Sequence, residues 1–495
     1  MRKSLPHVLR AVLLTLCTAA ALFAGNNKQK KTAWNWMEAN RQTAMAASRA
    51  VWENPEIGEL EYKSSAALAS YLERNGFTIE RGVADMPTAW VATFSNGDGP
   101  SLGYLAEFDA LPGLSQEAGN PVKTPIVQGG AGHGCGHSLL GAGSAYAAAG
   151  VKAAMVEHNI PGSVKVFGTP AEETLVGKVY MIRDGVFDGL DIALGWHPGS
   201  VNSVVYRSSL AMSSIKFRFH GKTAHGAGDP HHGRSALDAV ELTNTGVNFM
   251  REHVIEKARI HYVISDGGGA PNVVPDRAEV WYFVRAPKTE QQRPIYDWVR
   301  TIAKGASIMT ETTLEEELLT SCREFMLNDP LAKLLQENYE QVGPPDFDQA
   351  DWQFAAELAK NFDDPPEVLL DTTVAELKIV PPDEWEWGMG SVDDGDVSWN
   401  FPYGRITAAC AARGGNGHSW HMVTCAGSDI GFKGMTTAAR VLAGAGVEVL
   451  LNKKIRDAAW EDFHMKLDGR SYECGIPDGL RPPHSRPGQE NYTSR

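Results

Sequence analysis

The alternation of strand and helix signals in the first two hundred residues limits most strongly what this chain can fold into. An alanine-rich helical stretch at 139–158 separates short apolar runs that have the composition of buried strands. These runs lie at 88–95, 101–113, 163–168 and 191–196. The pattern predicts an α/β domain with a mixed sheet flanked by helices. In such sheets the functional residues gather at the carboxyl ends of strands.

The pattern changes near residue 210, where a strand, a long amphipathic helix, two strands and a further helix follow one another. This order predicts a two-layer α+β unit inserted into the larger domain. We divide the chain into a signal peptide at 1–25, the first part of the larger domain at 26–209, the inserted unit at 210–322, the second part at 323–466, and a flexible C-terminal tail at 467–495.

The N-terminus has the pattern of a secretory signal peptide. Arg2, Lys3 and Arg10 precede an apolar run that ends near Gly25 and is short for a membrane span. We expect a periplasmic or secreted protein, with an uncleaved membrane anchor as the alternative. The cleavage site stays open. The net charge of −14 argues against a nucleic-acid partner, because tracking phosphates requires an excess of Lys and Arg.

Six cysteines occur without any CxxC pair, which excludes a disulfide scaffold and a thiol redox motif. The disulfide state of four of them is left open by the sequence: Cys322, Cys410, Cys425 and Cys474.

One five-residue stretch, His133-Gly-Cys135-Gly-His137, places three potential metal ligands close together. Glycines between them let the backbone fold tightly around an ion. A glycine-rich loop with two solvated histidines is the alternative interpretation. The metal hypothesis requires partners elsewhere in the chain.

Further candidate ligands follow predicted strands. Glu172 and Glu173 come directly after one strand, His197 ends the next, and His418 lies in a glycine-rich segment near the C-terminus. Nitrogen, oxygen and sulfur donors together suit one or two divalent ions and admit Zn, Mn or Co. With adjacent glutamates, one can bind metal while the other handles a proton, which is the arrangement of metal-assisted hydrolysis.

Several separated motifs, in order, resemble a known family. They are "ENPEIGELEY", "LAEFDALPG", "GHGCGH", "GTPAEE", "LGWHP", "GKTAHGAGDP", "GRSALDAVEL", "PNVVPDRAEV" and "GSVDDGDVSW…GHSW". Together they are similar to the metallopeptidase and amidohydrolase family of aminoacylase, carboxypeptidase G and indole-acetyl-amino acid hydrolases. The matches extend from about Trp34 to Ala443, so the resemblance covers most of the chain.

The resemblance implies a site with two divalent ions per subunit, zinc or manganese. It assigns the metal ligands as Cys135, His137, Glu173, His197 and His418, with Cys135 shared between the ions. It also implies Glu172 as the general base, which takes a proton from water and returns it to the leaving amine. Asp109 would support the site by orienting a histidine.

The inserted unit resembles the dimerisation or lid domain of that family, and the larger domain its catalytic domain. His225 would reach into the partner subunit's site and stabilise the oxyanion, and Asn272 would contact substrate. Arg285 and Arg234 are candidates for binding a substrate carboxylate, although surface ion pairs are equally compatible with them. A homodimer is therefore expected, or a heterodimer with a related subunit.

The predicted function is hydrolysis of the amide bond of N-acyl or N-aroyl amino acids, such as p-aminobenzoyl-glutamate. A metallo-dipeptidase or carboxypeptidase is the nearest alternative, and a non-catalytic metal- or ligand-binding protein is the alternative from another class. We expect His133 to have a structural role, His231-His232 to lie on an exposed lid loop, and the acidic run at 393–396 to be structural near the site.

Overall fold

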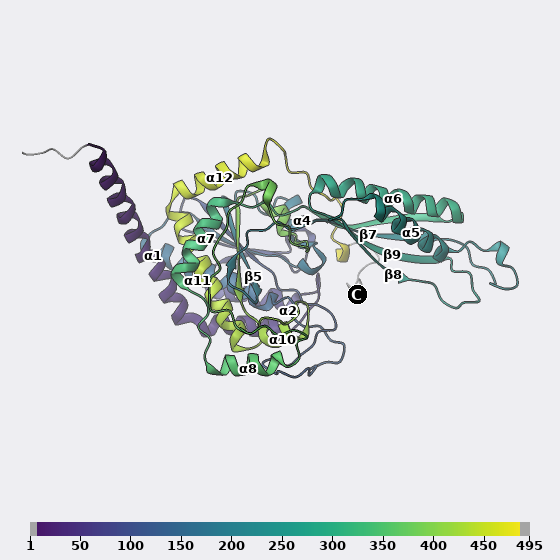
Figure 1. The fold of residues 1–495 in the computed structure, drawn as a ribbon, viewed down its shortest axis with the longest axis horizontal. Coiled ribbons are helices and arrows are strands. Elements are labelled where there is room, and N and C mark those ends of the chain that lie inside the picture. Colours follow the sequence, from purple (N-terminus) through teal and green to yellow (C-terminus); the bar gives the residue numbers. More distant parts are fainter. Residues whose placement is uncertain (1–6, 486–495) are drawn as a thin grey trace, which may run out of the picture.

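The computed structural model describes residues 7–485, and the side chains from residue 28 to residue 484. The chain forms a larger domain with a seven-stranded sheet and a smaller domain with a four-stranded sheet beside it (Figure 1). The predicted signal peptide at 1–25 lies outside the residues whose side chains are described.

The larger sheet is mixed, and its four central strands run parallel. Its order is β1-β2-β4-β3-β5-β11-β6, with β4, β3, β5 and β11 parallel to one another and the outer strands antiparallel to their neighbours. The strands are β1 (Thr78–Arg81), β2 (Trp90–Ser95), β3 (Ser101–Ala106), β4 (Ser163–Gly168), β5 (Ile192–Gly199), β6 (Ser203–Val204) and β11 (Tyr403–Ala409). The predicted fold class is confirmed, and β4 coincides with the predicted run.

Helices cover the larger sheet: α1 (His7–Trp52), α2 (Tyr62–Arg74), α3 (His137–His158), α4 (Gly177–Arg183), α7 (Asp329–Val342), α8 (Gln349–Ala359), α9 (Asp394–Ser398), α10 (Trp420–Ala426), α11 (Asp429–Leu451) and α12 (Lys453–Leu467). Both α3 and α11 are long and apolar enough to cross a membrane, but 83% of the apolar window of each is buried inside the protein. They are the central helices of the core. At Gly143 of α3 a Cβ atom would stand 2.6 Å from the Trp196 ring, so only glycine allows α3 to pack this closely on β5.

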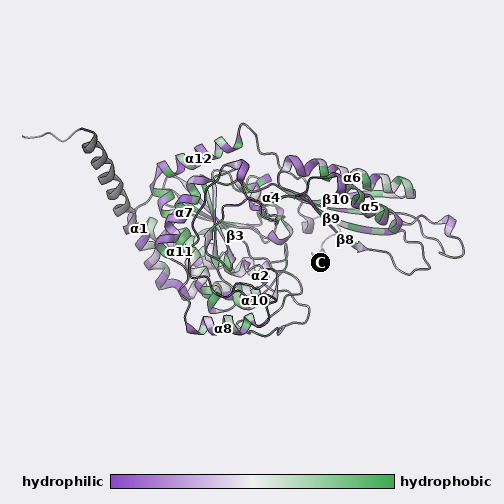
Figure 2. Cartoon of the chain, in the orientation of Figure 1, coloured by the Kyte–Doolittle hydropathy of each residue, from purple (hydrophilic) through white to green (hydrophobic). Residues whose placement is uncertain are grey.

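The smaller domain is an antiparallel sheet in the order β10-β7-β9-β8, with two helices packed on one face. Its elements are β7 (Ala211–His220), α5 (Ala236–Met250), β8 (Arg259–Asp266), β9 (Arg277–Ala286), α6 (Thr289–Thr310) and β10 (Thr313–Cys322). Both hydrophobic and hydrophilic residues occur along α6 (Figure 2). Its buried positions include Ile295, Val299 and Ala303, which are four residues apart. This spacing places one apolar stripe of α6 on the sheet.

Four strands are not predicted from the sequence: the short β1 and β6, and the longer β10 and β11. β10 is rich in glutamate, and β11, the strand through which the chain returns to the larger sheet, is flanked by segments without regular structure. Part of the expected C-terminal tail also packs on the body: Ile476 is buried, and the Tyr472 hydroxyl donates to Asp396. This differs from the loosely packed tail that the composition indicates, and residues 486–495 lie outside the described part.

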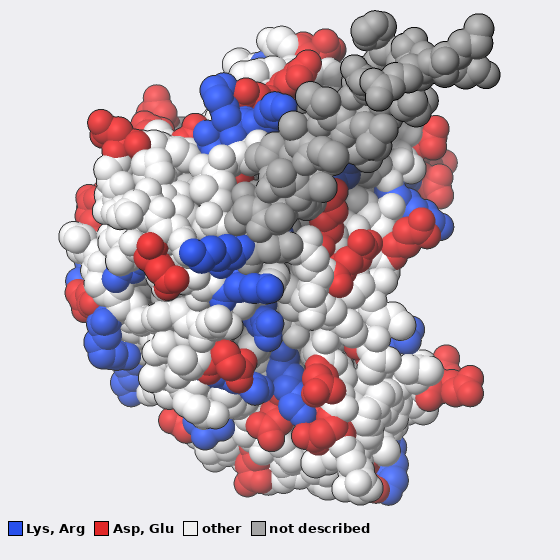
Figure 3. All heavy atoms as spheres, turned by 90° about the vertical axis from the view of Figure 1, so that its left-hand side faces the viewer, with Lys and Arg blue, Asp and Glu red and all other residues white. Residues whose placement is uncertain are grey.

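The surface carries both signs of charge. On the face shown in Figure 3, basic and acidic side chains are interspersed over the larger domain rather than gathered by sign. The five described cysteines at 135, 322, 410, 425 and 474 are free thiols.

Candidate metal centre

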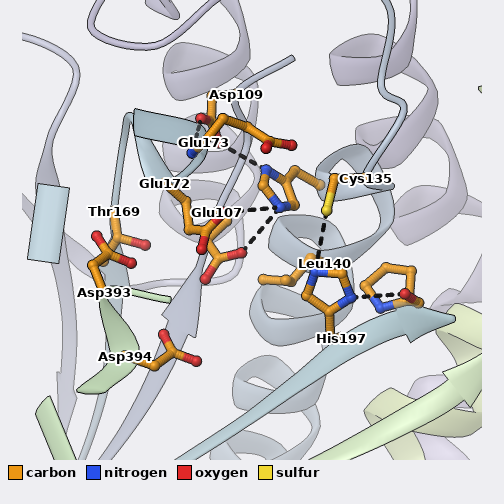
Figure 4. Close-up of polar contacts among 12 residues, drawn as sticks. Glu107, Asp109, Cys135, Leu140, Thr169, Glu172, Glu173, His197, Asp393 and Asp394 are labelled. Carbon is orange, nitrogen blue, oxygen red and sulfur yellow. Dashed lines mark hydrogen bonds and ion pairs between the residues drawn. The ribbon is translucent and has the colours of Figure 1, made fainter. Parts of the chain in front are cut away.

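The parallel strands bring distant acidic residues to one edge of the sheet. Glu107 and Asp109 follow the carboxyl end of β3, and Glu172 and Glu173 follow that of β4. His197 lies near the end of β5, which pairs in parallel with β3. Because the carboxyl ends of parallel strands meet at the same edge, these five side chains face a common space (Figure 4).

The start of α3 and the loop before it supply two more donors. Cys135 and His137 flank Gly136, which has φ +84°. A Cβ atom at Gly136 would stand 2.5 Å from the Met422 side chain and 2.9 Å from Pro198. Both the backbone conformation and the space therefore require glycine between the two ligands.

The donor atoms form two groups that share one sulfur. One group is Cys135, His137 and His197, and the other is Cys135, Glu173 and His418; within each group all donor atoms lie within 4.8 Å of one another. The Cys135 Sγ lies 3.3 Å from Nε2 of His197, and Nε2 of His418 lies 3.5 Å from Oε2 of Glu173. All five predicted ligands are thus brought together from four segments of the chain.

The donors fit divalent metal ions. Oε1 of Glu173 is buried and has no hydrogen-bond partner in the described part of the chain. Nε2 of His137 is buried without a well-aligned hydrogen bond, although the Glu107 carboxylate lies 3.2 Å away. Leaving such groups unpaired is costly unless an ion satisfies them. Thiolate, imidazole and carboxylate together form a donor set of the kind that binds zinc and similar ions.

Asp109 positions two of these ligands. Its Oδ1 accepts a hydrogen bond from Nδ1 of His137 at 2.7 Å, which leaves Nε2 of the ring directed at the site. Its Oδ2 accepts the backbone N–H of Glu173 at 2.9 Å. This is the orienting contact that metal-ligating histidines require.

Glu172 and the adjacent Glu173 face different histidines. Its Oε2 lies 3.7 Å from Nε2 of His137, whereas Glu173 faces His418. The preceding residue, Ala171, has φ +56°, and both glutamates lie in the short 3-10 helix Glu172–Thr174 that follows it. Burial, together with the nearby Glu107 carboxylate, raises the pKa of Glu172 well above its usual range. A carboxylate with a raised pKa accepts a proton more readily than one in water, which suits a general base.

The pKa of the Cys135 thiol also depends on its surroundings. Burial raises the pKa of Cys135 to about 12, and the Glu173 carboxylate acts in the same direction. A coordinating cation reverses this, because a thiol bound to a metal ion is deprotonated.

A buried ionic network lies beside the site. The acidic run at 393–396 is expected near the site from the sequence and lies there, whereas Glu107, Lys178 and Arg405 are not foreseen. Lys178 Nζ lies 2.7 Å from Oε1 of Glu107 and 2.6 Å from Oδ1 of Asp393, and Arg405 pairs with Asp394 at 2.9 Å. The other oxygen of Glu107 stands 3.2 Å from Nε2 of His137. Despite burial, Lys178 lowers the pKa of Glu107 to about 2. The position of Glu107, two residues before Asp109 at a strand end, was the only sequence signal for it.

Four further predicted residues lie on the smaller domain, and no hydrogen bond or ion pair joins them to the described donor groups. His225 and Asn272 are exposed and adjacent, since the Gly226 N–H donates to the Asn272 carbonyl. Arg234 pairs with Glu311 at 2.6 Å on the surface. Arg285 lies on β9 with its guanidinium near the Phe283 ring.

The remaining histidines of the motifs lie apart from the donor groups. His133 is buried, and its Nε2 lies 3.1 Å from the Val51 carbonyl at the end of α1. Burial lowers its pKa to about 4. His231 and His232 are exposed on the smaller domain, as expected.

Comparisons with known proteins agree with this geometry. The model of peptidase family M20/M25/M40 matches residues 103–375. The chain is 37% identical to the B subunit of p-aminobenzoyl-glutamate hydrolase from Escherichia coli (strain K12), over 90% of this chain and 97% of that protein. It is 27% identical to the Xaa-Arg dipeptidase of Homo sapiens, over 86% of this chain and 90% of that protein.

Solved structures share the fold. The aminobenzoyl-glutamate utilization protein from Klebsiella pneumoniae superposes with a TM-score of 0.57 at 17% identity, covering 84% of this chain and 97% of the other. The Bacillus subtilis YXEP protein, described as a dinuclear metal binding peptidase from the M20 family, gives 0.54 at 17% identity, covering 84% and 99%. At these identities the likeness concerns the fold alone.

Proposed function

The chain belongs to peptidase family M20/M25/M40 and is an amide-bond hydrolase, and from this premise we propose that it cleaves the amide joining an acyl or aroyl group to an amino acid. The observation that carries the proposal is the pair of donor groups sharing Cys135, with Glu172 directed at the same space. Ligands and base from separate strand ends form one reaction site.

We propose two divalent ions, zinc or manganese, held by Cys135, His137, Glu173, His197 and His418. When bound, the ions supply Lewis acidity toward the amide carbonyl and toward water. Glu172 takes a proton from the attacking water and delivers it to the leaving nitrogen. Asp109 holds the His137 ring in the required orientation. An exposed histidine of a second copy or related chain, His225, donates to the oxyanion.

The substrate class follows from the relatives. The name of the E. coli relative indicates p-aminobenzoyl-glutamate, and we propose an N-aroyl amino acid of this kind for the present chain. The human relative favours a dipeptide as the second candidate. The two are separated by blocking the substrate α-amino group: a dipeptidase requires it free, whereas an N-acyl amino acid hydrolase does not.

We propose that the smaller domain mediates dimerisation. β8 is an edge strand that pairs only with β9 among the described strands, and it exposes the apolar side chains of Val263 and Ile264. An exposed apolar edge of this kind favours pairing with another chain. The partner is a second copy or a related chain, because the E. coli relative is named as one of the subunits of its hydrolase. Light scattering of Val263→Glu and Ile264→Glu proteins should show monomers if β8 forms the interface.

We also propose export through removal of residues 1–25, on the evidence of the N-terminal sequence pattern. N-terminal sequencing of protein recovered from the producing cells distinguishes removal from an uncleaved anchor. A mature N-terminus near residue 25 supports the proposal, and an intact Met1 contradicts it.

The function is tested with protein stripped by chelator and reloaded with zinc or manganese. We expect release of p-aminobenzoate from p-aminobenzoyl-glutamate, about two metal ions per chain, as for two-metal sites generally, and loss of turnover on renewed chelation. Full metal loading without turnover on a broad amide panel would contradict the proposal.

A further inference from the structure

A cavity of about 240 Å³ opens directly on the donor groups. Three of the proposed ligands, Cys135, His197 and His418, form part of its wall. His418 stands at the solvent side, with 60% of its side chain exposed, so a substrate can enter past it. A group that extends from an amide held at the metal centre can therefore occupy this space without crossing protein.

The rest of the wall is mainly apolar. It includes Leu358 of α8, Phe362 just beyond α8, and Met422 of α10. No Lys or Arg occurs among the described residues that line it. A cavity of about 150 Å³ lined by apolar side chains binds benzene. The present one therefore has room for a benzene ring carrying a small substituent, and it offers no cation to a carboxylate.

His421 is a polar member of this wall, together with Ser200, Asn416 and the ligand histidines. Its side chain is more than nine-tenths buried, and neither ring nitrogen has a hydrogen-bond partner in the described structure. The ring packs edge-on against Phe362 with centroids 4.9 Å apart. A buried imidazole without partners is costly, and a polar substituent of a ligand would satisfy it.

A second cavity, of about 710 Å³, shares His197, Pro198 and Gly199 with the first. Its lining contains the cations Arg207, Lys378 and Arg405, together with several glutamates. A carboxylate-bearing amino acid finds charged partners there and none in the smaller cavity. The two cavities thus differ in the kind of group that each can receive.

We infer that the 240 Å³ cavity is the acyl-group pocket, and that it selects an aromatic acyl group whose far end carries a hydrogen-bonding substituent recognised by His421. The inference rests on the proposed function, because it assigns the acyl half of the amide substrate to this cavity. Phe362 supplies the aromatic wall, and His421 determines preference among substituted rings. The amino-acid half then lies toward the larger, charged cavity.

Binding of carboxylic acids to metal-loaded protein tests the inference without requiring turnover. The probes are acetate, benzoate, 4-aminobenzoate and 4-phenylbenzoate, measured by calorimetry. We expect benzoate to bind more tightly than acetate, 4-aminobenzoate more tightly than benzoate, and 4-phenylbenzoate to be excluded because it overfills the cavity. Equal affinity for acetate and benzoate in the intact protein overturns the inference.

Two variants separate the roles of the wall. Phe362→Ala should weaken benzoate binding about tenfold, and His421→Leu should reduce the preference for 4-aminobenzoate over benzoate about fivefold. His464→Leu is the matched control, because this histidine of α12 also packs on aromatic rings but lies outside the cavity wall. Metal content and circular dichroism establish whether each variant is folded. If one is not, the order of affinities for acetate, benzoate and 4-aminobenzoate in the intact protein decides the test.

The outcomes distinguish this inference from the proposed function. If the protein prefers aromatic acids, both variants weaken this preference and no amide is hydrolysed, the assignment of the acyl pocket is supported and the proposed function is overturned. If the protein hydrolyses aroyl-amino acids but both variants bind the acids as the intact protein does, the proposed function is supported and the assignment of the acyl pocket is overturned.

Discussion

Oδ1 of Asp109 lies 2.7 Å from Nδ1 of His137, and both side chains are fully buried. The carboxylate fixes which ring nitrogen faces the metal centre. We predict that Asp109→Asn lowers metal affinity about 10- to 100-fold, because the amide has no charge and cannot enforce one tautomer. Competition with a chromophoric chelator measures the change. Asp98→Asn, in an exposed loop, is the control and should bind metal as the original protein does.

Substitution of the two adjacent glutamates should have different effects on metal content and rate. Glu172→Gln should lower the rate of hydrolysis by about 10²- to 10⁴-fold, the usual contribution of general acid–base catalysis, with metal content unchanged. Glu173→Gln should lose metal, because Glu173 groups with Cys135 and His418. Glu172 groups instead with Glu107 and His137. Metal analysis of both proteins together with initial rates checks this. Identical metal content in the two variants would contradict the assignment.

Lys178→Met should destabilise the protein by about 3–5 kcal/mol. The substitution leaves the carboxylates of Glu107 and Asp393 buried without their cation. Urea unfolding of metal-free protein measures the loss in free energy of unfolding. Lys360→Met is the control, because the Lys360 side chain is 67% exposed and its ion pair is at the surface. A loss no larger than that of the control would show that the network is not stabilising.

Stability should fall as the pH rises through neutrality, in part because of Glu61. Burial, with Asp109 nearby, raises the pKa of Glu61 from 4.5 to about 8. Between these values the unfolded chain releases a proton that the folded chain keeps, so raising the pH favours unfolding. Glu61→Gln should flatten this dependence in urea unfolding of metal-free protein between pH 5 and pH 8. The exposed Glu73→Gln should leave it unchanged.

His225 should act on the site of another subunit. His225→Ala alone should lower the rate by about 10²- to 10³-fold, the cost of losing one oxyanion donor, and should keep its metal. Refolding an equal mixture of His225→Ala and Glu172→Gln chains should restore about a quarter of the activity, since half of the dimers are mixed and each has one intact site. No recovery in verified mixed dimers would exclude action between subunits.

The parts of the fold that were predictable are those in which one local pattern dominates. The run at 163–168 is apolar throughout except for Ser163 and Lys165 and ends at a glycine, and it forms β4 residue for residue. β10 was missed because Glu315 and Glu317 suggest a solvated segment, whereas both pair with Arg218 on the neighbouring β7. A charge whose partner lies about a hundred residues away carries no local signal.

The same distinction holds for the site. The convergence of His137 and Glu173 was predictable because metal-binding residue types follow predicted strands or lie in a glycine-rich motif, and their binding of metal stays a prediction. Lys178 was not, because a lysine within a short helix is usually exposed, and only folding brings it to Asp393. The acyl pocket was unpredictable for a similar reason, since Phe362 and His421 meet only through packing of separate segments.

The position of β11 also has a consequence for synthesis on the ribosome. Strand β11 pairs with β5 on one side and β6 on the other, although the whole smaller domain precedes it in the chain. The smaller domain has all its strands once residue 322 has emerged, whereas the larger sheet keeps β5 as an unpaired apolar edge until residue 409 has been made. The smaller domain of the nascent chain is therefore complete while the larger domain is not. During this interval the exposed edge of β5 is the site at which chaperones would be needed.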